Sequence, residues 1–155
     1  MAIPKKLLSY LDKAKIKYKI VRHKTVYTAY DAAQTLGVKL GEIAKTLVIK
    51  ADKIYLLAVL PASHKLDLGK LKKIVKAKKI EITREGIMKK VFKIKPGAVT
   101  PFGQIYKVPV YIDKTILRAK QIIAGAGTFE ESVAMTAKNF LKATSGIMGV
   151  FGKKK

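Results

Sequence analysis

Two apolar segments separated by a short polar stretch constrain the possible folds of this chain most strongly. Residues Thr46–Ile49 and Ile54–Leu60 are rich in Val, Ile and Leu, a composition typical of buried β-strands. The four residues between them, Lys50-Ala51-Asp52-Lys53, are suited to a hairpin connection. We therefore predict that these segments are the central strands of a sheet.

Amphipathic helices are predicted on both sides of this hairpin. Between Pro4 and Lys15, Leu7, Leu8, Leu11 and Ala14 recur at helical spacing, and Pro4 suits a first helical turn. Further helices are expected after residues that can cap them: from Thr28 to Gly37, from Asp67 onward, from Thr83 to near Lys90, and from Thr136 toward Gly146.

Short strand-like segments are mixed with these helices without a strict strand-helix alternation. They are residues 18–22, 80–82, 108–112, 121–124 and 131–135. The pattern predicts an α/β fold of the α+β type, with a mixed, largely antiparallel sheet or partial barrel surrounded by short helices. We expect one domain over residues 1–150 and a loose basic tail over residues 151–155.

The charge of the chain favours a polyanionic partner. There are 33 Lys and Arg against 10 Asp and Glu, a net charge of +23, and this repulsion would be relieved by phosphate groups. Only Arg22, Arg84 and Arg118 are not Lys among the basic residues, which favours contact with the phosphate backbone over recognition of bases. Binding to an anionic membrane surface and adaptation to heat remain alternative causes of the same charge.

Several kinds of chemistry are disfavoured by the residue types present. No apolar run approaches the ~20 residues of a membrane span, and the N-terminus does not resemble a signal peptide, so a cytoplasmic protein is expected. The chain has no Cys and two His residues, His23 and His64, without metal-ligand spacing. Residues 146–153 and 125–130 lack the full phosphate-loop and dinucleotide-binding patterns. We expect neither a metal nor a cofactor.

A set of short motifs, in a fixed order, covers roughly residues 5 to 145. They are His23 to Tyr27 before Ala32-Ala33, Ala44 to Ile49, Ala58 to Ala62 with Lys65 to Leu68, Gly97 to Gly103, Gly125 to Gly127, and Ser132 to Met135. In this order and spacing they resemble the YbaK family of aminoacyl-tRNA deacylases. The resemblance implies a compact α/β domain related to the editing insertion of bacterial prolyl-tRNA synthetases.

The function implied by this resemblance is that of a trans-acting aminoacyl-tRNA deacylase, which hydrolyses the ester of mischarged tRNA. The implied partners are the acceptor end of tRNA and a prolyl-tRNA synthetase, with no membrane. Such an ester is already activated, so orientation of the substrate and stabilisation of the oxyanion could suffice without a Ser, Cys or metal nucleophile. A hydroxyl of the terminal ribose is implied to help activate the water.

Two residues are the predicted catalytic residues. On an ideal strand Lys45 shares a face with Leu47 and Ile49, so its ammonium lies at the sheet margin or enters a pocket. The resemblance gives it polar contact with the aminoacyl carbonyl or with the nearby phosphate and ribose. The same resemblance gives Gly97 the presentation of backbone groups to the ester and its water, and a glycine permits such close approach.

The resemblance also implies a set of substrate-binding residues: His23, Tyr27, Thr46, Ala98, Pro101, Gly125, Gly127 and Ser132. His23 is placed at the pocket mouth or in an exposed loop. Tyr27 either stacks on the terminal adenine or packs in the core. Thr46 faces away from Lys45 on an ideal strand, so local twist would be needed to bring it to the site.

The substrate and even the catalytic activity stay open at this point. Relatives that remove alanine commonly carry Asn after the motif lysine, where this chain has Thr46, so Ala, Cys, Ser and Thr esters all remain candidates. An alternative is a catalytically inactive tRNA-binding module that partners a synthetase or the ribosome. The intact Lys45 and Gly97 motif is what a pure binding module would not need.

Overall fold

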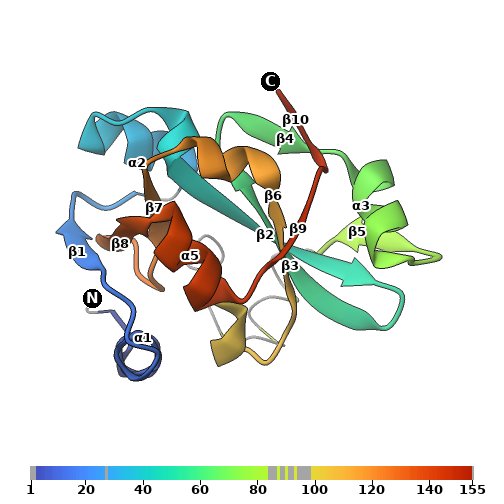
Figure 1. Cartoon of the computed structure of the whole chain (residues 1–155), viewed down its shortest axis with the longest axis horizontal. Helices are drawn as coiled ribbons and strands as arrows, with labels where there is room; N and C mark the ends of the chain where they lie inside the picture. Colours follow the sequence, from blue (N-terminus) through green and yellow to red (C-terminus); the bar gives the residue numbers. More distant parts are fainter. Residues whose placement is uncertain are drawn as a thin grey trace.

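The computed structural model describes residues 3–26, 28–83, 87, 90, 93 and 99–154. In this part of the chain, eight strands form one mixed sheet of order β1-β8-β7-β2-β3-β6-β9, with β5 paired to β2 (Figure 1). A second, two-stranded sheet consists of β4 and β10. The strands are β1 Lys19–Arg22, β2 Ile43–Ala51, β3 Ile54–Pro61, β4 His64–Leu66, β5 Ile80–Ile82, β6 Val110–Asp113, β7 Gln121–Gly125, β8 Glu131–Thr136, β9 Ile147–Gly149 and β10 Gly152–Lys154.

The predicted hairpin is the centre of the sheet, and its strands are longer than the sequence pattern indicated. β2 and β3 pair from Ala44↔Pro61 to Ala51↔Ile54, so only two residues form the turn. Asp52 adopts a left-handed conformation there (φ 53°), and its carboxylate accepts the backbone N–H groups of Lys78 and Lys79. Because these bonds tie the turn to the next segment, pairing continues through Lys50 and Ala51.

The strand directions confirm the predicted mixed, largely antiparallel sheet. Among the described residues, four pairings of the eight-stranded sheet are antiparallel and three are parallel. The two-stranded sheet is antiparallel. One parallel pairing, β2 with β7, is only two residues long and joins Ile43 to Ile123 and Ala44 to Ala124. Beyond this short contact the two strands are no longer paired, which leaves the following residues of both strands available for a site.

The helices begin at the predicted capping residues. They are α1 Lys5–Lys13, α2 Ala29–Leu36, α3 Leu68–Val75 and α5 Ala137–Thr144, with 3-10 turns η1 Leu40–Glu42, η3 Gly103–Ile105 and η4 Lys114–Arg118. The side chains of Thr28, Asp67 and Thr136 accept a backbone N–H three residues on, as an N-cap should. The helix predicted from Thr83 to Lys90 lies mostly outside the described residues.

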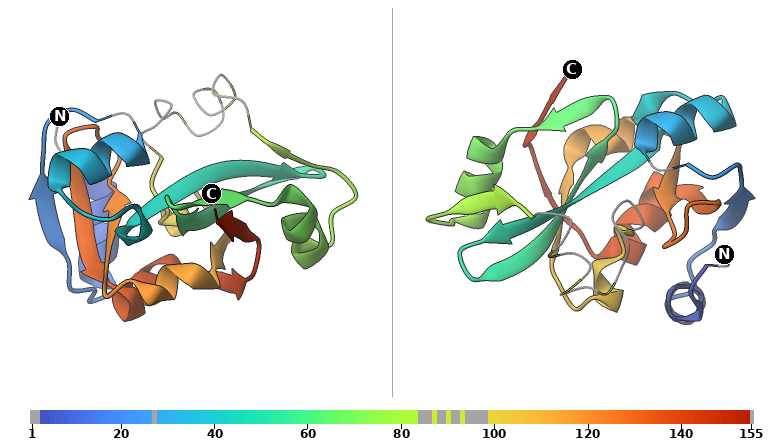
Figure 2. Two further views of the ribbon diagram at one scale, coloured as in Figure 1. Left: turned by 90° about the horizontal axis from the view of Figure 1, so that it is seen from above. Right: turned by 180° about the vertical axis from the view of Figure 1, so that it is seen from behind.

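Three hydrophobic clusters hold the helices against the sheet. The largest joins α1 and α5 to one face through Leu7, Leu11 and Phe140. The second lies under α2 and contains Ala33, Ile43 and Ile123, and the third lies under α3. In Figure 2 α2 and α5 cover opposite sides of the sheet. Because β2 alternates, its residues 43, 45, 47, 49 and 51 face the side of the second and third clusters.

The expectation of a loose tail from residue 151 is wrong for residues 151–154. Phe151 is fully buried in the third cluster, and β10 pairs with β4 from Gly152↔Leu66 to Lys154↔His64. The Asp113 carboxylate accepts the N–H groups of Phe151 and Gly152, each at 2.8 Å. Asp113 and the β4 residues lie far from this segment in sequence, so a local reading of the lysine-rich end missed these contacts.

Candidate active site

Lys45 lies between the two smaller hydrophobic clusters on one face of the sheet. On β2 it is preceded on that face by Ile43, which packs under α2, and followed by Leu47 and Ile49, which belong to the cluster under α3. The side chain is half-buried. The aliphatic part of this side chain therefore lies among apolar residues, and its ammonium group has less freedom to move than those of the exposed lysines on the helices.

The ammonium group of Lys45 is held by the backbone. Its Nζ donates a hydrogen bond of 2.7 Å to the carbonyl oxygen of His64, the first residue of β4. The Nδ1 atom of the His64 ring lies 2.9 Å from the Ser63 hydroxyl oxygen. The hydrogen bond to His64 directs the Lys45 ammonium toward the start of β4.

Gly125 and Ser132 lie on the same face as Lys45. Lys45 directly follows Ala44, whose partner on β7 is Ala124, so Gly125 is the corresponding next residue of β7. Gly125 pairs with Ser132 on β8, and paired residues of neighbouring strands project to the same side. Lys45, Gly125 and Ser132 therefore form a row across three adjacent strands, although Lys45 is far from the other two in sequence.

His23 extends this row through a hydrogen bond to Ser132. Its Nε2 is 2.9 Å from the Ser132 Oγ, and its Nδ1 is 2.8 Å from the carbonyl oxygen of Lys24. Since a carbonyl can only accept, Nδ1 carries a hydrogen, and in the neutral ring Nε2 accepts the proton of the Ser132 hydroxyl. The lone pairs of the serine oxygen then remain able to accept hydrogen bonds from other donors. Ser132 is buried, with 6% of its surface exposed.

The described part of the Gly97–Gly103 motif lies against Gly125 of β7 and Gly127 of the turn that follows it. A Cβ atom at Gly125 would lie 3.2 Å from the carbonyl oxygen of Val99. Gly127 has a φ of +87°, and a Cβ there would lie 3.1 Å from Pro4 and 3.8 Å from the Thr100 methyl group. Pro101 follows directly and is buried. Glycine is therefore required at position 127 by its conformation and favoured at position 125 by close backbone contact.

The remaining predicted site residues are not brought together by the described structure. Thr46 pairs with Val59 while Lys45 pairs with Leu60, so Thr46 projects to the opposite face, and no local twist brings it to the row. Tyr27, Gly97 and Ala98 lie outside the described residues. The row that the structure describes thus contains Lys45, Gly125, Ser132 and His23, with Val99 close to Gly125 and Thr100 close to Gly127.

The backbone of His64 is a contact that the sequence could not indicate. Ser63 and His64 fall between the motif segments Ala58–Ala62 and Lys65–Leu68, and a main-chain carbonyl carries no signal in its residue type. Only the register of β2 and β3 brings these residues to Lys45. In the described ranges, no cluster of three or more His, Cys, Asp or Glu residues could hold a metal.

The row can orient and stabilise a polar ligand. It supplies a positively charged donor at Lys45, a hydroxyl acceptor at Ser132 and a backbone without side chain at Gly125. Neither a bound metal nor a cysteine is needed for such groups to position an already activated ester. In the same described part of the chain, no helix is long and apolar enough to cross a membrane.

Comparison with known proteins identifies similar proteins over most of the chain. A deacylase of Enterococcus faecalis, EbsC, named for Cys-tRNA(Pro) and Cys-tRNA(Cys), is 27% identical over 82% of this chain and 85% of its own. The prolyl-tRNA editing protein ProX of Acetoanaerobium sticklandii is 28% identical over 72% of this chain and 71% of its own.

A solved structure confirms the fold class. It is described as a trans-editing enzyme for prolyl-tRNA synthetase and superposes with a TM-score of 0.85 over 96% of both chains, at 24% identity. The sequence model of the aminoacyl-tRNA editing domain matches residues 23–143, a range that begins at His23 and contains the whole row of site residues. This chain belongs to the aminoacyl-tRNA editing domain family.

Proposed function

We propose that this protein is a trans-acting aminoacyl-tRNA deacylase that hydrolyses the ester of mischarged tRNA in the cytoplasm. The observation that carries this proposal is the row of Lys45, Gly125, Ser132 and His23 inside the region matched by the editing-domain family. The names of the two similar proteins, both for editing or deacylation of tRNA, support the same reaction. The net charge of +23 supports a tRNA substrate.

In the proposed reaction, water attacks the carbonyl carbon of the aminoacyl ester. The bond between this carbon and the ribose oxygen breaks, and the products are the free amino acid and tRNA with its terminal hydroxyl restored. The Lys45 ammonium, fixed by the His64 carbonyl, stabilises the negative charge that develops on the ester carbonyl oxygen. Gly97 and Ala98 contribute backbone groups to the ester and the water.

The Ser132 and His23 pair binds the amino group of the substrate. Because the Ser132 proton is directed to His23 Nε2, the serine oxygen accepts a hydrogen bond from the α-ammonium group, a donor that every aminoacyl ester carries. Gly125 lets the Val99 carbonyl oxygen approach β7 beside this pair. We assign Tyr27 to the terminal adenine, and Pro101 and Gly127 to substrate binding beside the row.

The second candidate function is a tRNA-binding module without catalysis, which partners a prolyl-tRNA synthetase or the ribosome. The lysine-rich surface would serve this role equally well. The fixed Lys45 ammonium favours catalysis instead, because phosphate binding alone does not need a lysine enclosed between two apolar clusters.

The test is a panel of tRNAs mischarged with Ala, Cys, Ser and Thr, with hydrolysis of the labelled ester measured over time. We expect one or more of these esters to be hydrolysed well above the uncatalysed rate. The same panel identifies the amino acid removed. Tight tRNA binding without hydrolysis of any ester would overturn the enzymatic proposal and support the binding module.

A further inference from the structure

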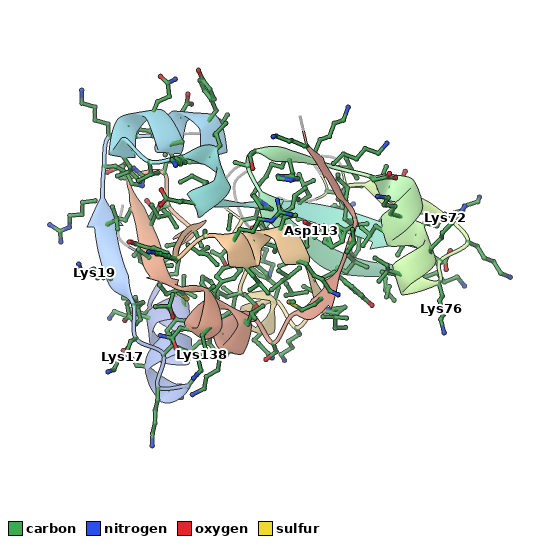
Figure 3. All side chains as sticks on the ribbon, turned by 45° about the horizontal axis from the view of Figure 1, so that its top comes forward. Lys17, Lys19, Lys72, Lys76, Asp113 and Lys138 are labelled. Atoms are coloured by element: carbon green, nitrogen blue, oxygen red, sulfur yellow. The ribbon has the colours of Figure 1, made fainter. Side chains whose placement is uncertain are left out.

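The surface formed by α3, β4 and β10 carries a concentration of exposed lysines beside the candidate active site. Residues 64–76 and 149–154 contain one acidic residue, Asp67. Their lysines are all exposed: Lys65, Lys70, Lys72, Lys73, Lys76, Lys153 and Lys154. We call these seven residues the α3–β10 lysine surface. In Figure 3 Lys72 and Lys76 project outward from α3 into solvent.

The lysines of this surface are arranged so that like charges oppose each other. Lys65 and Lys153 are direct partners across β4 and β10, a position in which like charges destabilise a sheet. Lys72 and Lys76 are four residues apart, at the end of α3 and its cap, where like charges also repel. The one acid is already engaged, since Asp67 accepts the N–H of Lys70 and forms an ion pair of 3.3 Å with Lys153.

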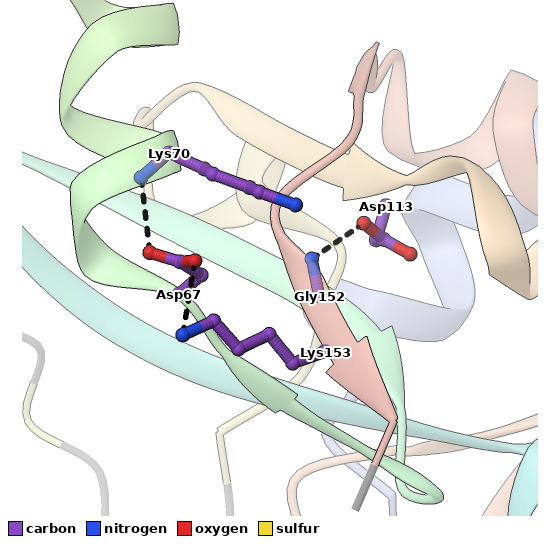
Figure 4. A network of polar contacts seen from close by, with 5 residues as sticks. All are labelled: Asp67, Lys70, Asp113, Gly152 and Lys153. Carbon is purple, nitrogen blue, oxygen red and sulfur yellow. Dashed lines mark hydrogen bonds and ion pairs between the residues drawn. The ribbon is translucent and has the colours of Figure 1, made fainter.

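Hydrogen bonds and an ion pair hold α3, β4 and β10 together despite the repulsion between their lysines (Figure 4). The Asp113 carboxylate accepts the N–H groups of Phe151 and Gly152, and Asp67 N–H donates to the Phe151 carbonyl at 2.7 Å. A Cβ at Gly152 would lie 3.2 Å from the Asp113 carboxylate, so glycine lets the two groups approach. Lys153, which follows these anchored residues, therefore stays opposite Lys65 despite the repulsion between their charges.

The pair of strands β4 and β10 is joined directly to the candidate active site through His64. The carbonyl that accepts the Lys45 ammonium belongs to His64, and His64 is the β4 residue that pairs with Lys154. A polymer whose end is bound at Lys45 is therefore within reach of β4 and β10. Regularly spaced negative charge along that polymer would relieve both like-charge contacts.

We propose that the α3–β10 lysine surface binds the phosphodiester backbone of the tRNA acceptor stem while its aminoacylated end lies at Lys45. This inference rests on the proposed function and adds the location of the RNA on the protein. Contacts of lysine with phosphate carry no sequence information, so the surface recognises the stem without selecting its bases.

The test compares two variants that remove equal charge. In K65Q/K72Q/K76Q three lysines of the surface lose their charge, and in the matched control K17Q/K19Q/K138Q three exposed lysines of β1, its preceding segment and α5 do so (Figure 3). The dissociation constant for uncharged tRNA is measured by fluorescence anisotropy over a range of salt concentrations. Both variants are first checked for an unchanged circular dichroism spectrum and melting temperature.

We expect the surface variant to bind tRNA about tenfold or more weakly, and its log–log salt slope to fall by roughly two to three. The control should change binding by about threefold at most. Equal weakening in both variants, or a change of less than about threefold in the surface variant, would overturn the proposal. So would loss of binding to vesicles of phosphatidylserine and phosphatidylcholine with tRNA binding unchanged.

A second measurement separates this proposal from the proposed function. Hydrolysis of mischarged tRNA is compared with hydrolysis of an aminoacyl-adenosine ester, which has no stem. The surface variant should raise KM for the tRNA and leave the small ester unaffected, and an equal effect on both substrates would overturn the proposal. If the wild-type protein hydrolyses neither substrate, the proposed function fails, while the tRNA-binding comparison still decides the location of the RNA.

Discussion

Lysine serves in two different ways in two neighbouring regions of this protein. Lys45 is a half-buried residue between apolar clusters, with its ammonium fixed by the His64 carbonyl. The α3–β10 lysine surface next to it consists of seven exposed lysines, and the segments that carry them, residues 64–76 and 149–154, contain one acid, Asp67. In the first region the position of one charge matters, and in the second the number of charges matters.

This difference explains how lysine can serve both in catalysis and in binding of a polyanion. A fixed ammonium acts on a single developing charge, and its effect depends strongly on distance. Exposed lysines act on a polyanion through counterion release, so their effects accumulate and weaken with salt. Substitutions in the two regions should therefore change different measured quantities.

The largest effect is expected from removal of the fixed ammonium. Lys45→Ala should lower kcat for the ester by about 100-fold or more, the typical loss when one donor to a developing oxyanion is removed. The control is Lys53→Ala, at the exposed turn of the same hairpin, which should retain nearly full activity. Steady-state hydrolysis measures both. A Lys45→Ala enzyme with more than half of the wild-type kcat would remove Lys45 from the reaction.

The next effect concerns the anchor of the lysine surface. Asp113→Ala leaves the buried N–H groups of Phe151 and Gly152 without their acceptor, so the free energy of unfolding should fall by about 2–3 kcal/mol. Urea unfolding measures this loss, and hydrogen exchange should show faster exchange at residues 151–154. Asp31→Ala, an exposed substitution in α2, is the control. Unchanged exchange at residues 151–154 in Asp113→Ala would show that another contact anchors β10.

A smaller effect is expected at the serine of the row. Ser132→Ala removes one hydrogen-bond acceptor for the substrate amino group and should lower kcat/KM about tenfold, the equivalent of roughly 1.4 kcal/mol. His23→Gln should have a similar or smaller effect, since its role is to orient the serine hydroxyl. Kinetics on the ester identified by the panel measure both. An unaltered kcat/KM in Ser132→Ala would place the amino group elsewhere.

The smallest effect is a pH dependence of stability. Burial by itself raises the pKa of Asp113, but hydrogen bonds from Thr115 and from the N–H groups of Phe151 and Gly152 outweigh it and lower the pKa below its usual value. The stabilisation is therefore fully present above about pH 4, the range in which an unfolded Asp is ionised, and is lost as the pH falls through the folded-state pKa. Asp113→Asn should flatten the acid side of a plot of unfolding free energy against pH. A curve as steep as that of the wild type would assign the acid dependence to other carboxylates.

The sequence predicted the parts of the fold that depend on local patterns. Helix caps at Thr28, Asp67 and Thr136 and the central hairpin follow from side-chain hydrogen bonding and strand propensity within a few residues. The C-terminal strand β10 was missed because its anchors, Asp113 and Phe151, act through contacts that no local pattern contains.

The sequence could predict only those parts of the candidate site that depend on the identity of a side chain. The family motifs indicated Lys45, Gly125, Ser132 and His23. Strand register aligns the first three in a row, and the hydrogen bond between His23 and Ser132 extends it. The role of His64 depends on a backbone carbonyl and has no such signal. Thr46 was assigned by motif membership, whereas the alternation of β2 directs it to the other face.

The most direct test of the division between the two regions is single-turnover hydrolysis with enzyme in saturating excess over mischarged tRNA, repeated at several salt concentrations. At low salt K65Q/K72Q/K76Q should reach the wild-type rate, because saturation restores binding, while Lys45→Ala should stay about 100-fold slower at every salt concentration. Recovery of Lys45→Ala at saturation, or a persistently slow rate for the surface variant, would contradict the division.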